Sequence, residues 1–301
     1  MKQNETVISF TNEDSWTILS SIEQSIKNKI EAIGIPLKDW NININYGIKT
    51  GYNEAFIIDS AKRQEILNNC STEEERNKTD AIIRPILRGR DIKQYSYDWM
   101  GLYLIATFPS RNYDINQYPA LKEYLLTFGQ QKLAQTGEKN INGILNNNAR
   151  KKTNNEWFET QDSINYWEDF SKPKIMYPNM TKYMPFYYDE KGFYQNDKSF
   201  MITGEHVSFL TAFLNSSLFK FCFSNSFPEL QGGTRELRKI FFDKIPVIKV
   251  SDEVNTVFKR AVTEIQNSYS KEQAIHIDNM IFDLYNLSDE ERKLIGYIEI
   301  E

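Results

Sequence analysis

Residues 47–59 read Gly-Ile-Lys-Thr-Gly-Tyr-Asn-Glu-Ala-Phe-Ile-Ile-Asp, the stretch of this chain that says most about its fold. Two glycines bracket a lysine and a threonine, and a polar step separates them from the apolar run 55–58. Gly47 and Gly51 permit backbone angles that other residues avoid, and they let a second backbone or a phosphate come close. The pattern predicts a glycine-hinged loop that leads into a β-strand over 55–58. An ordinary loop before an ordinary strand is the simpler alternative.

Outward from this loop, the hydrophobic patterning predicts an α+β fold. Short apolar runs separated by Gly, Asn, Asp and Pro predict strands at 55–58, 102–107, 174–177, 184–188 and 198–202. Apolar residues at helical spacing predict helices at 12–34 (capped by Asn12 or Ser15), 119–134, 205–223 and 252–285. Further patterns indicate a charged helix or flexible loop at 61–80, a long exposed loop at 137–155, and a last helix begun by the Ser288–Glu291 capping box.

The same patterns divide the chain into three parts. Residues 1–36 form a helical connector, residues 37–250 a β-rich domain with a few helices, and residues 251–301 a helical tail. A length of 301 residues suits about two domains, so the β-rich part is the main one and the helical parts flank it.

Composition narrows the class of protein. The chain has only two cysteines, which indicates reduced thiols rather than a disulfide framework or a cysteine-based zinc site. The chain has no apolar signal region at its start and no stretch of ~18 apolar residues, so we expect a cytoplasmic protein without a membrane partner. The net charge is −5, but residues 84–249 carry 22 basic and 17 acidic residues. Positive charge therefore concentrates where phosphate contacts would need it, with a solvated surface as the alternative.

Catalytic motifs are missing from the sequence. It has no Pro-Pro pair, and therefore no Asn/Asp-Pro-Pro-aromatic loop for a flipped adenine, and no glycine-rich cofactor or phosphate motif. Asp189-Glu190-Lys191 has the residue types of a nuclease site, but a turn between two strands accounts for it better. His206 and His276 suit helix-end or core positions. We expect no catalytic residue and no metal site in this chain.

Segments suited to nucleic-acid binding are better represented. Residues 84–92 place three arginines around a glycine turn, and arginine makes bidentate contacts with phosphate or a guanine edge. Structural ion pairs of Arg90–Asp91 and a neighbouring acid are the alternative. Residues 150–158 mix cations, amides and aromatic side chains in a predicted loop, with a solvated loop as the alternative. Residues 231–239 place three cations after a Gly-Gly pair whose N–H groups can meet a phosphate.

These segments resemble one family, in the same order along the chain. The string 47–59 resembles the start of the TaqI-like C-terminal specificity domain, the target-recognition module of type IIG restriction–modification enzymes and related adenine methyltransferases. Other segments resemble further signatures of the family: Arg-Gly-Arg-Asp-Ile at 88–92 with Tyr95, Lys-Pro-Lys-Ile at 172–175, the Gly-Gly segment before Lys-Ile-Pro at 244–246, and Leu-Tyr-Asn-Leu at 284–287. Separately, the aromatic residues Tyr187, Tyr188, Phe193 and Tyr194 resemble a hairpin with cross-strand packing in the core, with base stacking as the alternative. Asn286 stands where glycine is usual, and Asn tolerates left-handed angles.

The resemblance covers about residues 37–287 and implies that residues 37–250 recognise a short site in double-stranded DNA. The segments above supply the candidate DNA contacts: Lys49, Thr50, Tyr52, Asn53, Arg88, Arg90, Arg150, Lys151, Lys152, Asn154, Asn155, Trp157, Lys172, Lys182, Arg235, Arg238 and Lys239. Because this chain lacks the catalytic motifs, it is expected to be non-catalytic by itself. S-adenosylmethionine and magnesium are expected only in a partner methyltransferase or nuclease domain or subunit.

Three explanations of the missing catalytic half stay open: a fragment, a separately encoded specificity subunit, or a truncated gene product. Two other classes of function also stay open. One is a small stand-alone DNA-modifying enzyme with a dispersed active site. The other is an aromatic-rich module that binds carbohydrate or protein, since the chain has 17 tyrosines and 19 phenylalanines.

Overall fold

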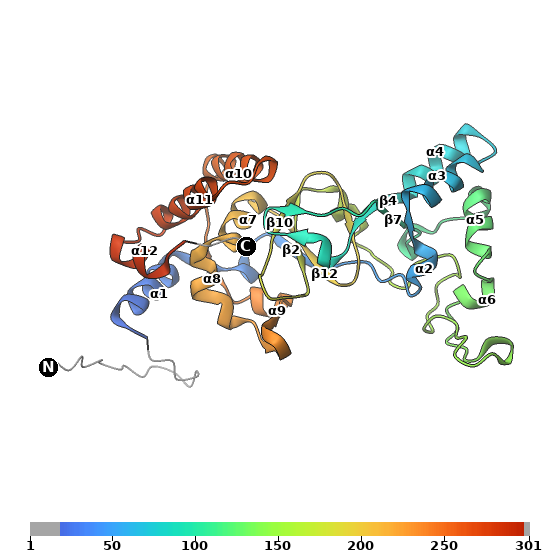
Figure 1. Ribbon diagram of the computed structural model, residues 1–301, viewed down its shortest axis with the longest axis horizontal. Coiled ribbons are helices and arrows are strands. Elements are labelled where there is room, and N and C mark those ends of the chain that lie inside the picture. Colours follow the sequence, from blue (N-terminus) through green and yellow to red (C-terminus); the bar gives the residue numbers. More distant parts are fainter. Residues whose placement is uncertain (1–18, 298–301) are drawn as a thin grey trace. The chain divides into compact units, whose positions relative to one another are not determined.

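A computed structural model describes residues 19–297, and these form two compact units. Unit 2 is residues 43–203, and the described part of unit 1 consists of the segments before and after it in the sequence, 19–42 and 204–297 (Figure 1). The mixed α+β class predicted from the sequence is confirmed. The division into a connector, a β-rich domain and a tail, with boundaries at 36/37 and 250/251, stays a prediction. Compactness alone does not test it. Asn12 and Ser15 lie outside the described residues.

Unit 2 is built on two four-stranded sheets, with strand orders β10-β8-β12-β2 and β11-β4-β7-β3. The strands are β2 (Ile42–Tyr46), β3 (Ile57–Asp59), β4 (Ile83–Leu87), β5 (Ile92–Lys93), β6 (Ser96–Tyr97), β7 (Leu102–Ile105), β8 (Lys174–Pro178), β9 (Met180–Thr181), β10 (Tyr187–Asp189), β11 (Tyr194–Gln195) and β12 (Ser199–Gly204). The two β-strands at the centre of the first sheet, β8 and β12, pair antiparallel over five residues. Every residue of β8 is buried, so this strand is covered on both faces.

The helices of unit 2 lie mainly beside the second sheet, where α3 packs on α4, α5 and β7 (Figure 1). They are α2 (Asn53–Phe56), α3 (Ser60–Asn68), α4 (Glu73–Ile82), α5 (Pro119–Leu126) and α6 (Gln130–Leu133), with 3₁₀ turns η2 (Gly89–Asp91), η3 (Pro109–Arg111), η4 (Ile115–Gln117), η5 (Ile141–Gly143) and η6 (Trp167–Ser171). The predicted single helix 119–134 is wrong, because Gly129 has φ +86° and separates α5 from α6. The charged segment 61–80 is helical, and 137–155 is a loop apart from η5.

The predicted first strand, 55–58, is partly wrong. Residues 53–56 form the short helix α2, and the strand β3 begins only at Ile57. The helical turn brings both Ala55 and Phe56 into the core, where they are fully buried. A strand would direct neighbouring side chains to opposite faces, so it could not bury both on one side.

The predicted hairpin 187–194 is also wrong in its pairing. Strand β10 pairs antiparallel with β8, whereas β11 pairs parallel with β4 in the other sheet. The four aromatic side chains are nevertheless buried, as the core interpretation predicts. The predicted strand 184–188 begins late because Met184 has φ +50°, which no strand accommodates.

Unit 1 is mainly helical and has an aromatic core. Its elements are α1 (Ser21–Ile33), β1 (Gly34–Pro36), η1 (Leu37–Asp39), α7 (Val207–Asn215), α8 (Ser217–Phe223), η7 (Ser224–Ser226), β13 (Glu229–Leu230), η8 (Gln231–Gly233), β14 (Thr234–Glu236), α9 (Lys239–Phe242), β15 (Pro246–Ile248), α10 (Asp252–Asn267), α11 (Lys271–Leu284) and α12 (Asp289–Ile295). Helix α10 packs on α7 and α11 (Figure 1). Strand β1 pairs antiparallel with β15, and β13 with β14.

Serine residues break two helices that the apolar spacing predicts as continuous. Ser216 ends α7 and caps α8, so 205–223 is two helices. Ser268 and Ser270 likewise separate α10 from α11 within 252–285. A serine hydroxyl competes with the helical backbone for hydrogen bonds, which is why the apolar repeat continues while the helix does not.

Two details near the end of unit 1 agree with the sequence. The Ser288–Glu291 capping box is present at the start of α12. Asn286 has φ +49°, so it adopts the left-handed conformation expected where glycine is usual. The predicted helix 12–34 is only partly confirmed, because α1 begins at Ser21, with a capping box of Ser20 and Glu23, and residues 19–20 are not helical.

Within residues 19–297, no single helix has the length and apolar composition of a membrane span. Helix α7 and the segment 217–226 pass that test only as a pair, and they are bent by 68° relative to each other.

Candidate nucleic-acid interface

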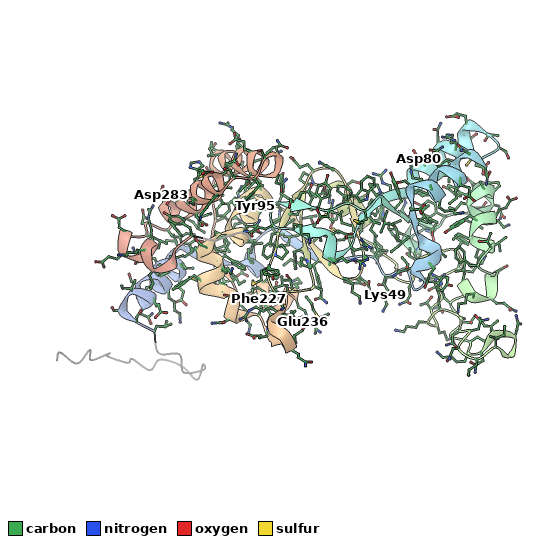
Figure 2. The ribbon with its side chains drawn as sticks, viewed as in Figure 1. Lys49, Asp80, Tyr95, Phe227, Glu236 and Asp283 are labelled. Carbon is green, nitrogen blue, oxygen red and sulfur yellow. The ribbon has the colours of Figure 1, made fainter. Side chains whose placement is uncertain are left out.

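The loop at 47–51 is fixed in shape by its two glycines. A Cβ atom on Gly47 would lie 2.0 Å from the main-chain oxygen of Asn196, so the two backbones touch there. Gly51 has φ +78°, which favours glycine. The side chain of Lys49, between them, is exposed, while its main-chain oxygen accepts a hydrogen bond from the Gln161 amide at 3.1 Å. Lys49 lies in the segment between β2 and α2 (Figure 2). The loop therefore presents one cation from a rigid backbone.

Thr50 has a structural role instead of the predicted DNA contact. Its side chain is buried, its hydroxyl donates to the Asn53 Oδ1 atom at 2.7 Å, and it accepts from the Tyr52 amide. These bonds shape the turn into α2. The Asn53 side chain remains exposed, whereas Tyr52 is half-buried and packs against the core with an edge contact to Phe128. Of these three, only Asn53 keeps a free face.

Arg150 is buried and holds three loops together. Its guanidinium donates four hydrogen bonds to main-chain oxygens: those of Leu133, Thr50, Glu159 and Trp157, at 2.6 to 2.8 Å. Burial lowers its pKa to about 10, and the Glu159 carboxylate opposes that shift. Since four of the five guanidinium N–H groups are used inside the protein, we remove Arg150 from the DNA-contact set.

The rest of the 150–158 segment divides into exposed and structural residues. Lys151, Lys152 and Asn154 are exposed. The Asn155 amide donates to the main-chain oxygens of Thr160 and Gln161, and Trp157 packs partly buried against the core. Arg150 therefore fixes a loop whose two lysines face the solvent.

The arginines at 88 and 90 have different roles. Arg88 makes a bidentate ion pair with Asp91, both N···O distances being 2.8 Å, and the Asp91 carboxylate also accepts from the Arg88 amide. That pair closes the turn η2, so a structural ion pair is present, but Arg88 forms it with Asp91 in place of the Arg90 considered from the sequence. Arg90 is exposed, and no ion pair holds it among residues 19–297. Arg90 keeps its candidate role.

The Lys-Pro-Lys-Ile strand contributes structure through its second lysine. Lys174 is fully buried and ion-paired with Asp189, whose carboxylate also accepts from the Phe193 and Lys191 amides at 3.0 Å. Asp189 is therefore a partner for a core lysine rather than part of a nuclease site. Lys172 is exposed and pairs with Asp169 at 2.8 Å, and Lys182 is exposed.

In unit 1, the cations after the Gly-Gly pair are partly occupied. Arg235 donates to the Phe227 main-chain oxygen at 2.9 Å and pairs with Glu229, which holds the β13–β14 hairpin. Arg238 pairs with Glu236 at 2.6 Å, and Glu236 is labelled in Figure 2. Lys239 pairs with Asp243 at 2.7 Å. The cations of the Arg238–Glu236 and Lys239–Asp243 ion pairs are exposed, so a phosphate can replace the carboxylate at little cost. Arg235 is structural.

The carboxyl group of Asp162 interacts electrostatically with two of the lysines near the loop 47–51. Burial raises the pKa of its carboxyl, while the Lys49 and Lys151 ammonium groups oppose that shift. The two lysines come from loops that lie about a hundred residues apart in the chain and are joined by the hydrogen bond from Arg150 to the Thr50 main-chain oxygen. The linear charge map could not reveal that these loops are neighbours.

Two side-chain contacts in the same unit, one between a cation and an aromatic ring and one between two aromatic rings, were not predicted from the sequence. The guanidinium carbon of Arg111 lies 3.8 Å from the centre of the Trp167 ring. Tyr46 makes an edge contact with Tyr166, whose hydroxyl donates to the Tyr46 main-chain oxygen at 2.9 Å. No local signal links these pairs, because their members are distant in the chain and meet only through the fold.

A pocket elsewhere in unit 2 has the wrong charge for DNA. It has a volume of about 520 Å³ and is lined by the carboxylates of Glu54, Asp59, Glu65 and Glu123 against the single ammonium of Lys62. A surface with that excess of carboxylates repels phosphates, so the candidate contacts lie outside this pocket.

Comparisons with known proteins agree on one kind of relative. Residues 84–247 match the family model of the TaqI-like C-terminal specificity domain. A type II methyltransferase, M.PaeR7I of Pseudomonas aeruginosa, is 21% identical over 287 residues, which cover 94% of this chain and 45% of that protein.

Two solved structures share the fold at low sequence identity. The type IIG restriction endonuclease BpuSI matches with a TM-score of 0.51 at 12% identity, over 89% of this chain and 34% of that one. The type IIL restriction–modification enzyme MmeI, solved in complex with DNA, matches with a TM-score of 0.52 at 10% identity, over 87% of this chain and 36% of that one. The chain thus spans less than half the length of each of these relatives.

Proposed function

The chain belongs to the TaqI-like C-terminal specificity domain family, and from this premise we propose that it is the DNA target-recognition module of a type II restriction–modification system. It binds one short duplex site and positions a separate catalytic domain or subunit there. The finer assignment is a type IIG-like enzyme or an adenine-specific methyltransferase, acting in the cytoplasm. S-adenosylmethionine and magnesium belong to the catalytic partner.

The observation that carries the proposal is a set of exposed cations on loops that the fold holds rigid. Lys49, Lys151 and Lys152 extend from the two loops that Arg150 joins, and among residues 19–297 none of the three forms an ion pair within 4.0 Å. Lysines left without a carboxylate partner on a fixed backbone suit contacts with phosphates, which set the register of a protein on duplex DNA.

The proposal divides the candidate contacts into those available to DNA and those used inside the protein. The available set is Lys49, Asn53, Arg90, Lys151, Lys152, Asn154, Lys172, Lys182, Arg238 and Lys239. The internal set is Thr50, Tyr52, Arg88, Arg150, Asn155, Trp157 and Arg235, which shape the loops that carry the first set.

Salt dependence of duplex binding tests this proposal. The full chain is titrated with a pool of mixed-sequence duplexes, and log K is plotted against log salt concentration between about 50 and 200 mM. We expect a linear, steep loss of affinity, and we expect Lys49→Ala and Lys151→Ala each to reduce the slope by about one. Lys139→Ala is the matched control, because Lys139 is an exposed lysine of the 137–155 loop outside the proposed set.

Two results would contradict the proposal. One is no detectable duplex binding at low salt by a chain whose circular dichroism shows it folded. The other is binding that does not respond to salt, as expected of a carbohydrate-binding surface.

A further inference from the structure

Arg111 has its guanidinium closer to an aromatic ring than any other arginine in the described part of unit 2. It ends the turn η3, its side chain is exposed, and its guanidinium lies against the Trp167 ring at 3.8 Å and near the Tyr113 ring at 5.6 Å. At 3.8 Å the guanidinium and indole planes are close enough to stack face to face. Stacking fixes the plane of the fork while leaving its N–H groups at the edge free.

No carboxylate competes for that fork. Among residues 19–297, Arg111 makes no ion pair and its guanidinium makes no hydrogen bond, whereas Arg63, Arg88 and Arg150 are each bound to a carboxylate or to main-chain oxygens. A planar cation with five unused donors is a site for a planar acceptor pair.

The backbone beneath Arg111 is tied to the 158–164 segment at four points. Thr107 donates its hydroxyl to the Phe158 oxygen at 2.5 Å, and its own main-chain oxygen accepts from the Thr160 amide. Ser110 donates its amide to Ser163 and its hydroxyl to the Ile164 oxygen at 3.0 Å. Trp167, for its part, packs against the hydrophobic core. The backbone that carries Arg111 and the ring of Trp167 are therefore held in place before any ligand arrives.

The segment 158–164 also contacts the loops that carry the proposed phosphate contacts Lys49 and Lys151. The Gln161 amide binds the Lys49 main-chain oxygen, and the Gln161 main-chain oxygen accepts from the Asn155 side chain in the loop that carries Lys151. Residues 161–167 thus run from the lysines to the stacked arginine.

We propose that Arg111, held against Trp167, is a specificity-determining residue that reads a guanine edge in the bound duplex. The inference rests on the proposed function. A phosphate needs only a cation, and the neighbouring lysines supply that. A guanine presents its O6 and N7 acceptors in one plane, and a stacked arginine fork matches that pair without losing side-chain freedom on binding.

Sequence selection tests the inference. The full wild-type chain, Arg111→Ala and Arg111→Lys each select from a pool of duplexes with a randomised core, and the bound fractions are sequenced. We expect a guanine preference at one position in the wild type, which both variants lose. The affinity ratio between guanine and the other bases at that position should fall by roughly 5- to 150-fold. Arg111→Lys keeps the charge, so its salt slope should stay unchanged while the base preference is lost.

Arg260→Ala is the matched control, because Arg260 is an exposed arginine on α10 in unit 1. It should keep the guanine preference. If the wild type selects a sequence and Arg111→Ala selects the same one, the inference is overturned and the proposed function stands. If Arg111→Ala weakens all sequences equally and lowers the salt slope by about one, Arg111 is a phosphate contact and the inference is again overturned. If the wild type binds no duplex at low salt, the proposed function fails and the inference with it.

Discussion

The guanidinium of Arg150 donates a hydrogen bond to the main-chain oxygen of Thr50, 100 residues earlier in the chain, at a distance of 2.8 Å. This bond joins the opening glycine loop to the lysine-bearing loop that follows Arg150. Three further main-chain oxygens accept from the same side chain, so a single buried cation determines how the two loops sit against each other within unit 2.

Replacing Arg150 should destabilise unit 2 severely. Arg150→Ala would leave buried main-chain oxygens without donors, and each such group costs about 1–3 kcal/mol. We expect the free energy of unfolding to fall by at least about 3 kcal/mol in urea titrations near neutral pH, where the side chain is still a cation because its pKa is about 10. Lys151→Ala, one residue on, should change it by less than about 0.5 kcal/mol, since that side chain is exposed. Equal effects of the two substitutions would refute the structural role.

Gly47→Ala should be costly through collision rather than through backbone angle. The added Cβ would lie 2.0 Å from the Asn196 oxygen, and the backbone must move to admit it. Overpacking of this kind costs about 1–3 kcal/mol or more, and thermal unfolding measures it. Gly143→Ala is the control: Gly143 has φ +73°, but nothing lies within 4 Å of its added Cβ, so only the angular cost of about 1 kcal/mol applies. A smaller loss at Gly47 than at Gly143 would contradict the close contact.

Sequence patterns indicated where the loops with candidate contacts lie. They did not indicate which residues of each loop turn inward. Gly51 has the positive φ that a local glycine requirement predicts, and Gly47 allows the close approach of a second backbone, although the sequence did not indicate that this backbone is the one at Asn196. Arg150 was expected to contact DNA and instead binds carbonyls, because a run of cations in one loop carries no information about which member turns inward. That choice depends on Thr50 and Leu133, which only the fold brings near.

The same limit explains the missed pair of Arg111 and Trp167. Each residue alone is unremarkable in the sequence, and their contact depends on the bonds that tie Ser110 to residues 163 and 164. Helix breaks were missed for a different reason: apolar spacing continues through Ser216, so periodicity could not reveal a cap within it.

Lys174 and Asp189 should behave as one unit in stability measurements. Both side chains are fully buried, so substituting either alone strands a charge, and such losses are about 3–5 kcal/mol. Burial lowers the pKa of Lys174, and Asp189 opposes that shift. We expect Lys174→Met and Asp189→Asn each to be strongly destabilising, and the double variant to lose clearly less than the two single losses combined. Additive losses in this double-mutant cycle would show that the two groups are independent.

Glu291 should make the stability of unit 1 depend on acidity. Its carboxylate accepts from the Lys29 ammonium and the Ser25 hydroxyl of α1, both at 2.7 Å, and from the Ser288 amide. Burial alone would raise the pKa of Glu291, but these bonds from Lys29, Ser25 and Ser288 outweigh it and hold the pKa below its ordinary value. The folded protein therefore binds this proton less readily than the unfolded chain. The stabilisation is complete above the unfolded pKa of about 4.5 and is lost as the pH falls through the folded value.

We expect Glu291→Gln to lower the free energy of unfolding by about 1–3 kcal/mol near neutral pH, because it removes hydrogen bonds to a charged group. The difference from the wild type should shrink as the pH falls from about 6 towards 4 and below, as the wild type loses the same interaction by protonation. Glu290→Gln is the matched control, because Glu290 is the exposed neighbour in the same first turn of α12. A difference between Glu291→Gln and the wild type that stays constant over this range would mean that the carboxylate charge does not hold α12 to α1.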